Sequence, residues 1–184
     1  MSSSSADGSR GLPPWADVSP HRLEHIARVA GLLDAWASRI AIPRAERIRW
    51  LRAAYLHDAL KDAPADELAE LAGPQWPQRK IRHGPAAARK AEMAGEDDGG
   101  VLDAVRYHSV GYAQWDQVGR MLYLADYLEP GRPFSGPEHD DWLVRVPTEP
   151  DVVLREVTSV RIARSLSQGH SLLPQTVAFW NSLV

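Results

Sequence analysis

Residues 48–62, IRWLRAAYLHDALKD, set the architecture of this chain: an apolar helical run that closes on a histidine and an aspartate. Asp58 is seven residues from Leu51 and three from Tyr55, so helical geometry turns its carboxylate toward the side expected to be buried. A buried carboxylate costs several kcal/mol unless a cation or strong hydrogen bonds meet it. We therefore expect a partner for Asp58 inside the fold.

Helical spacing of apolar residues dominates the remainder of the chain, and no alternating strand pattern interrupts it. Capping residues, prolines and glycines predict helices that begin at Ser19-Pro20, at Pro43, at Pro64, just after His83-Gly84-Pro85, after Gly99-Gly100, near Val118, before Val153 and at Pro174. The Pro/Gly-rich stretch 130–150 is predicted to be loop. The expectation is an all-α fold with a disordered tail over residues 1–12 and one helical domain over residues 13–184.

Composition narrows the class of protein and the chemistry available to it. The net charge of −3 is spread along the chain without a basic block, so we expect no nucleic-acid partner. The absence of cysteine leaves nitrogen and oxygen as the only ligands for a metal. No apolar run approaches the length of a membrane span, and the Ser-rich start has no secretory signal, which predicts a cytoplasmic protein without a membrane partner.

Histidines and acids recur at helix ends, where they could form a metal site. His57 and Asp58 are adjacent, and a carboxylate can bridge two cations while an imidazole binds one, so Asp58 is the candidate bridge and His57 a terminal ligand. The other candidate ligands are His25, His83, His108 and Asp126. We interpret His21, His139 and His170 as surface residues.

Each candidate ligand could also have a purely structural role that involves no metal. His25 could be a histidine at the edge of the core that is satisfied by a backbone carbonyl. His83 and His108 could simply occupy helix ends, and the His57–Asp58 pair could be solvated. Asp126 lies in an apolar neighbourhood, where Arg132 could serve as its partner in place of a metal.

Taken together, the segments resemble the HD superfamily of metal-dependent phosphohydrolases, and more closely its YqeK-like branch. The similarity covers nearly the whole chain after the Ser-rich start. The segments that carry it are Arg22-Leu23-Glu24-His25, Leu56-His57-Asp58-Ala59-Leu60-Lys61, His83-Gly84-Pro85-Ala86-Ala87-Ala88, Val105-Arg106-Tyr107-His108-Ser109-Val110-Gly111 and Leu124-Ala125-Asp126-Tyr127-Leu128-Glu129-Pro130-Gly131-Arg132. Ala87 and Ala88 depart from the Val-Gly common in that branch, and Val110 replaces a small residue.

The resemblance implies symmetrical hydrolysis of diadenosine tetraphosphate to two ADP by a di-iron centre in an all-helical domain. One iron would be held by His25, His57, Asp58 and Asp126. Asp58, His83 and His108 would hold the other. Iron is the metal that the resemblance implies, and manganese or zinc also suits such ligands.

Two cations about 3.5–4 Å apart can share one hydroxide that attacks a phosphate held across them. Lys61 is the first candidate for stabilising the charge that develops on the phosphate, although it could instead cap the helix end. Arg132 is the second, and His108 and Ser109 are expected beside the substrate. Asp62 would orient Lys61 or act on the leaving group.

Two other functions stay open at the level of the sequence. The domain could hydrolyse another nucleotide, such as a guanosine tetraphosphate alarmone or a nucleoside monophosphate. It could also be a metal-bound nucleotide sensor without turnover, although a sensor has no need of a pair of metals that generates a nucleophile. A homodimer is compatible with the sequence, which does not fix the oligomeric state.

Overall fold

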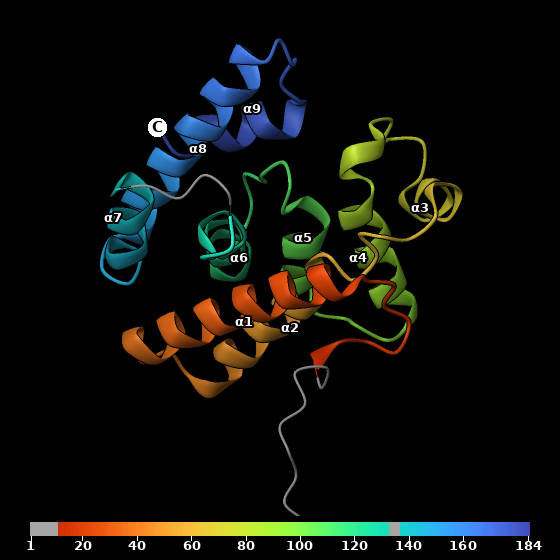
Figure 1. Cartoon of the computed structure of the whole chain (residues 1–184), viewed down its shortest axis with the longest axis horizontal. Coiled ribbons are helices and arrows are strands. Elements are labelled where there is room, and N and C mark those ends of the chain that lie inside the picture. The colour runs from red at the N-terminus through yellow and green to blue at the C-terminus, as the bar shows by residue number, and fades with distance from the viewer. Residues whose placement is uncertain (1–10, 133–136) are drawn as a thin grey trace, which may run out of the picture.

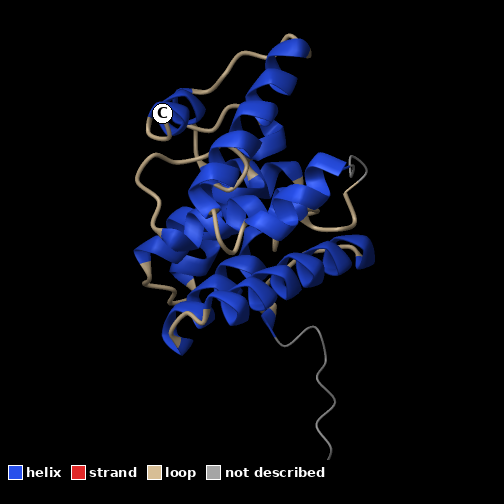
Figure 2. Cartoon of the chain, turned by 90° about the vertical axis from the view of Figure 1, so that its left-hand side faces the viewer, coloured by secondary structure: helices blue, strands red, loops and turns tan. Residues whose placement is uncertain are grey.

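A computed structural model describes residues 11–132 and 137–184, and every regular element in these ranges is helical (Figures 1 and 2). The all-α prediction is confirmed, and the predicted tail over residues 1–12 lies mostly outside the described part. No helix in the described ranges is both long and apolar enough to cross a bilayer. The elements are α1 (Pro20–Ile40), α2 (Arg44–His57), α3 (Ala65–Ala72), the short 3-10 turn η2 (Arg79–Ile81), α4 (His83–Met93), α5 (Gly99–Tyr107), α6 (Gln117–Leu128), α7 (Pro137–Arg145), α8 (Pro150–Ser167) and α9 (Pro174–Asn181).

The helix α2 is central to the bundle, because α1, α4, α5 and α6 all pack against it. In Figure 1, α1 crosses the front of the molecule over α2, while α5 and α6 lie behind and above them. The core between these helices is fully buried and includes Leu33, Ala53, Val101 and Leu122. Burying a side chain of the size of leucine contributes about 1.5–3 kcal/mol, so this core fixes how the helix ends meet.

Local capping explains where several helices begin. The Ser19 hydroxyl accepts a hydrogen bond from the Arg22 backbone N–H, and Pro20 follows at the first helical position. Asp98 and Asp116 cap α5 and α6 in the same way. Arg49 of α2 donates to both carboxylates, at 2.7 Å in each case, and so ties three helices together.

Gly84 allows α4 to approach the end of α5. A Cβ atom at this position would lie 2.9 Å from the Val105 carbonyl oxygen and 3.1 Å from that of Arg106. It would also lie 3.2 Å from the His108 ring. Only glycine fits this contact without moving one helix, and the contact brings His83 and His108 together.

The structure corrects three predictions. The helix α2 ends at His57, so Asp58 occupies the capping position and the chain then turns, whereas the apolar pattern had continued to Leu60. The stretch 130–150 contains the helix α7 and is not all loop. His139 lies in that helix and is only 4% exposed, so its interpretation as a surface residue is wrong, whereas His21 and His170 are exposed as predicted.

Candidate metal centre

Six histidine and aspartate side chains from five helices and their ends converge inside the bundle, each between 0% and 7% exposed. His25 comes from the second turn of α1, and His57 is the last residue of α2. The other four are Asp58 just after α2, His83 at the start of α4, His108 just after α5, and Asp126 in the last turn of α6. These are the six ligands expected from the sequence, and the structure brings all of them together.

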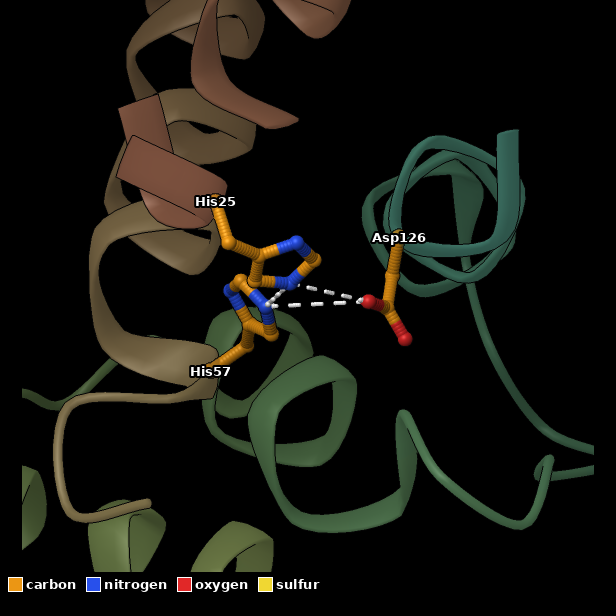
Figure 3. Close-up of side chains that lie close together, drawn as sticks. All are labelled: His25, His57 and Asp126. Atoms are coloured by element: carbon orange, nitrogen blue, oxygen red, sulfur yellow. Dashed lines mark hydrogen bonds and ion pairs between the residues drawn. The ribbon is translucent and has the colours of Figure 1, made fainter. Parts of the chain in front are cut away.

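Three of these residues form a first group, His25, His57 and Asp126, whose ligand atoms lie within 4.8 Å of one another (Figure 3). The His25 Nε2 atom is 3.3 Å from His57 Nε2 and 3.2 Å from Asp126 Oδ1. Figure 3 shows the two imidazoles facing the carboxylate from the opposite side of the site. Two nitrogens and one oxygen therefore point at a common space.

Asp58, His83 and His108 form a second group of the same kind. Asp58 Oδ1 lies 3.2 Å from His83 Nε2 and 3.5 Å from His108 Nε2. The other carboxylate oxygen, Oδ2, faces the first group, at 3.6 Å from His25 Nε2. One carboxylate thus presents an oxygen to each group, which is the arrangement that a bridging ligand requires.

The protonation of the imidazoles tests whether this donor set suits a cation. His57 Nδ1 is 2.6 Å from the Ala54 carbonyl oxygen and His108 Nδ1 is 2.8 Å from that of Val105, and a carbonyl can only accept. His25 Nδ1 faces the Glu129 carboxylate at 3.1 Å. In neutral rings bonded in this way, each Nε2 keeps a lone pair directed into the site. Lone pairs at 3.3 Å repel unless a cation lies between them, so the donor set fits a divalent metal.

The electrostatics of the site favour the ligating forms of these groups. Burial lowers the pKa of His57 to about 4, despite the opposing charge of Asp58. Burial likewise lowers the pKa of His83 to about 4. Burial opposes ionisation of Asp58, but the surrounding histidines hold its pKa well below the usual value. At neutral pH His57 and His83 are therefore neutral and Asp58 is ionised, the forms that bind metals.

Cationic side chains border both groups. The Lys61 Nζ atom is 3.0 Å from His83 Nε2, and burial lowers the pKa of this lysine. Arg132 donates to the Asp126 backbone oxygen at 2.8 Å and pairs with the Asp126 carboxylate. Arg132 is thus a partner of Asp126 alongside His25, as one of the two interpretations left open by the sequence expects, and a metal at Asp126 stays a prediction.

Two residues of the site were not assigned by the sequence analysis. Glu129, 2% exposed, accepts hydrogen bonds from His25 and from Arg28, whose Nε atom is 2.5 Å away. Arg22 donates to Asp58 Oδ2 at 2.7 Å. Arg22 is three residues before His25 and therefore shares its helix face. Arg22 and Glu129 also belong to segments that carry the family resemblance, although the sequence analysis gave neither of them a role.

The remaining predicted residues lie in different places. The Ser109 hydroxyl is 3.1 Å from His108 Nε2 and 3.3 Å from His83 Nε2, at the edge of the second group. Asp62 is exposed and accepts a hydrogen bond from the Ser19 backbone N–H at 2.8 Å. This contact gives Asp62 a structural role at the start of α1, and its suggested part in catalysis stays a prediction.

Comparisons with known proteins agree with this geometry. The HD domain family model matches residues 22–131. A symmetrical bis(5′-nucleosyl)-tetraphosphatase from Halalkalibacterium halodurans is 28% identical over 178 residues, which cover 91% of this chain and 93% of that protein. A protein of the same name from Bacillus subtilis is 29% identical, with 91% of each chain covered. A crystal structure of a predicted HD superfamily hydrolase from Clostridium acetobutylicum superimposes with a TM-score of 0.79 at 23% identity, over 90% of each chain, and therefore shares the fold.

Proposed function

The chain belongs to the HD domain family, and from this premise we propose that it is a phosphohydrolase with two divalent metals that cleaves diadenosine tetraphosphate symmetrically to two ADP. Two bacterial relatives of nearly full length carry the name of that activity, which supports the proposed substrate. Iron is the proposed metal, with manganese and zinc as alternatives that suit the same nitrogen and oxygen ligands.

The observation that carries the proposal is the position of Asp58 between the two groups of ligands. Its Oδ1 atom is 3.2 Å from His83 Nε2, and its Oδ2 atom is 3.6 Å from His25 Nε2. In this proposal His25, His57 and Asp126 would hold one metal, His83 and His108 would hold the other, and Asp58 would be a ligand to both. When bound, such a metal pair supplies an activated water and neutralises charge on the attacked phosphate.

The chain's own cations have separate roles in the proposed reaction. Lys61, beside the second group, would hold a phosphate oxygen and stabilise the charge that builds on it. Arg132, which the Asp126 backbone oxygen orients, would bind another phosphate through its planar guanidinium. Ser109 would donate its hydroxyl hydrogen to the substrate at the edge of the site. Together these groups would orient the phosphate chain before the bond breaks.

The proposal is tested by product analysis of purified protein loaded with iron or manganese. Diadenosine tetraphosphate should yield ADP as the sole nucleotide product on anion-exchange chromatography. His57→Ala should abolish the activity, because it removes a ligand that is 0% exposed at the centre of the site. His21→Ala, which removes an exposed histidine from the same helix as His25, is the matched control and should retain it.

Other products would redirect the proposal. ATP and AMP in place of ADP would mean asymmetric cleavage. A panel that includes guanosine tetraphosphate and nucleoside monophosphates, assayed beside diadenosine tetraphosphate, would reveal a different substrate. Binding of nucleotide without any product over hours would instead indicate a sensor.

A further inference from the structure

Beside the metal centre, three adjoining hollows follow α8. The central hollow, of about 250 Å³, is lined by Asp126 and by the arginines Arg132, Arg161 and Arg164. Since Asp126 is one of the proposed metal ligands, this hollow lies beside the first group. A site with three guanidinium groups suits a ligand with several phosphate charges.

A second hollow, also of about 250 Å³, shares Arg161 and Ser165 with the lining of the central one. Its lining includes Ser109, which lies beside the second group of ligands, and the apolar residues Ile81, Leu172 and Leu173. The apolar wall and the hydroxyl groups nearby suit a nucleoside, whose base is flat and apolar on its faces and whose ribose is polar.

The third hollow, of about 340 Å³, shares Tyr127 and Arg164 with the lining of the central one. Its lining includes Trp142 and His139. Both ring nitrogens of His139 are buried and lack a hydrogen-bond partner among the described residues, although buried polar groups are almost always bonded. A hollow whose lining includes the Trp142 ring suits the flat face of a purine base.

Arg161 is fixed at the junction between the central hollow and the second one. Its guanidinium carbon lies 4.2 Å above the Tyr123 ring and 5.3 Å from the Tyr127 ring. Its Nη2 atom donates to the Ser109 backbone oxygen at 3.2 Å. These contacts hold the side chain across the junction, so little conformational freedom would be lost when it binds a phosphate.

We propose that the three hollows form one groove for a dinucleoside polyphosphate, with the phosphate chain over Arg161 in the central hollow and one nucleoside in each end hollow. The proposal rests on the proposed function and specifies which residues would hold its substrate. A mononucleotide would leave one end hollow empty, whereas a ligand with a nucleoside at each end would fill both. The proposed metal ligand Asp126 lines the central hollow, and Ser109 lies beside the proposed ligand His108. The metals would therefore lie near the phosphate chain, which agrees with cleavage within that chain.

The test uses the metal-loaded protein and two analogues whose bridging oxygens are replaced by methylene groups, so that neither is hydrolysed. One is an analogue of diadenosine tetraphosphate, and the other is the matching adenosine tetraphosphate with a single nucleoside. Calorimetry should give a Kd for the two-ended analogue about 10-fold below that of the one-ended analogue. Arg161→Met should weaken both by about 10-fold, because it removes a charge-assisted contact to phosphate. Arg155→Met, an exposed arginine on the same helix, is the matched control.

A bulky side chain in either end hollow should remove only the difference in Kd between the two-ended and the one-ended analogue. Val160→Trp in the third hollow and Leu172→Trp in the second should each bring the two-ended Kd to the one-ended value, and either variant suffices if the other fails to fold. Equal binding of the two analogues to the wild type, or an Arg161→Met effect no larger than that of Arg155→Met, would overturn the groove. ADP release is measured separately, so a groove that fails while ADP is released leaves the proposed function standing. Tighter binding of the two-ended analogue without any ADP release would support the groove and contradict the proposed function.

Discussion

At the scale of single residues, the site depends on side chains that hold the ligands as much as on the ligands. Glu129 accepts from His25 Nδ1 at 3.1 Å and so fixes which ring nitrogen faces the site. Burial opposes ionisation of Glu129, but hydrogen bonds from Arg28 and His25 lower its pKa. It therefore carries a negative charge beside the imidazole, which makes that ring a better metal ligand.

Glu129→Gln removes this charge while keeping the size of the side chain. Loss of such a partner typically lowers metal affinity by about 10–100-fold, and we expect that range here. Competition with a chelating dye measures the affinity. Glu24→Gln, an exposed acid that also pairs with Arg28, should leave the affinity unchanged, and equal affinities for both variants would show that Glu129 does not support the metal.

Lys61→Met separates charge stabilisation from metal binding. Lys61 lies beside the second group without belonging to it, so metal content should be preserved. The kcat should fall by about 10²–10³-fold, the usual effect of removing one donor that stabilises developing charge. Lys90→Met, in a pair with Glu67 at the protein surface, provides the control. An unchanged kcat would leave Lys61 as a helix-end residue.

The sequence analysis named all six candidate ligands, because each is a residue type that binds metals and the set is implied by the resemblance to the HD superfamily. The structure brings the six side chains together, and their binding of a metal stays a prediction. The roles of Arg22 and Glu129 could not be predicted. Helical spacing fixes which face a residue occupies, but Glu129 meets His25 across 104 positions of sequence. Only the packing of α6 against α1 determines that contact.

At the scale of helices, the contact between α4 and α5 sets the second group. Gly84→Ala would place a Cβ atom 2.9 Å from the Val105 carbonyl oxygen and must push the two helices apart. We expect the variant to lose about half of the bound metal, since His83 and His108 would separate, and to unfold at a lower temperature. Elemental analysis and a thermal melt measure both effects. Gly99→Ala, where a Cβ would meet nothing within 4 Å, should change neither.

The ion pairs of Arg49 with Asp98 and Asp116, which link α2 to α5 and α6, should make the stability of the fold depend on pH. Hydrogen bonds from Arg49 lower the pKa of Asp98 from its usual value of 3.8 to about 2. A pKa lowered by folding stabilises the protein above pH 3.8, and this contribution is lost as the pH falls from about 4 to about 2. Asp98→Asn should therefore be less stable than wild type at pH 6, with the difference shrinking toward pH 2.

Urea unfolding at a series of pH values measures this difference, with Asp97→Asn as the control because Asp97 is exposed and adjacent. A gap between Asp98→Asn and wild type that stays constant down to pH 2 would contradict the role of the ion pair.

The sequence analysis did not predict the helix α7, because local sequence patterns do not report contacts with distant parts of the chain. Prolines and glycines around residue 137 favour a loop, yet α7 begins at Pro137, a residue type that suits a first helical turn. The helix is fixed by distant contacts, because buried Trp142 donates to Glu156 of α8 at 2.9 Å. Those contacts also bury His139, which explains why its surface assignment failed.

At the scale of the whole molecule, the proposed metals would join segments that are distant in sequence. The six ligands come from α1, α4, the ends of α2 and α5, and α6. A ligand that binds only the folded state stabilises it by RT ln(1 + [L]/Kd), about 4 kcal/mol at a concentration 1,000 times the Kd. Removal of the metals should therefore lower the Tm by roughly 8 °C or more.

A thermal melt before and after dialysis against a chelator measures this shift, and the metal added back should restore it. His57→Ala, which lacks a ligand, should show a smaller shift. A Tm that does not respond to the chelator would mean that the histidines and aspartates are stable together without a cation.

The most direct test of two metals sharing Asp58 is anomalous X-ray diffraction from crystals of the iron- or manganese-loaded protein. We predict two anomalous peaks inside the bundle, one among His25, His57 and Asp126 and one between His83 and His108, with a carboxylate oxygen of Asp58 on each. A protein without such peaks, or with metal bound elsewhere on its surface, would contradict the account.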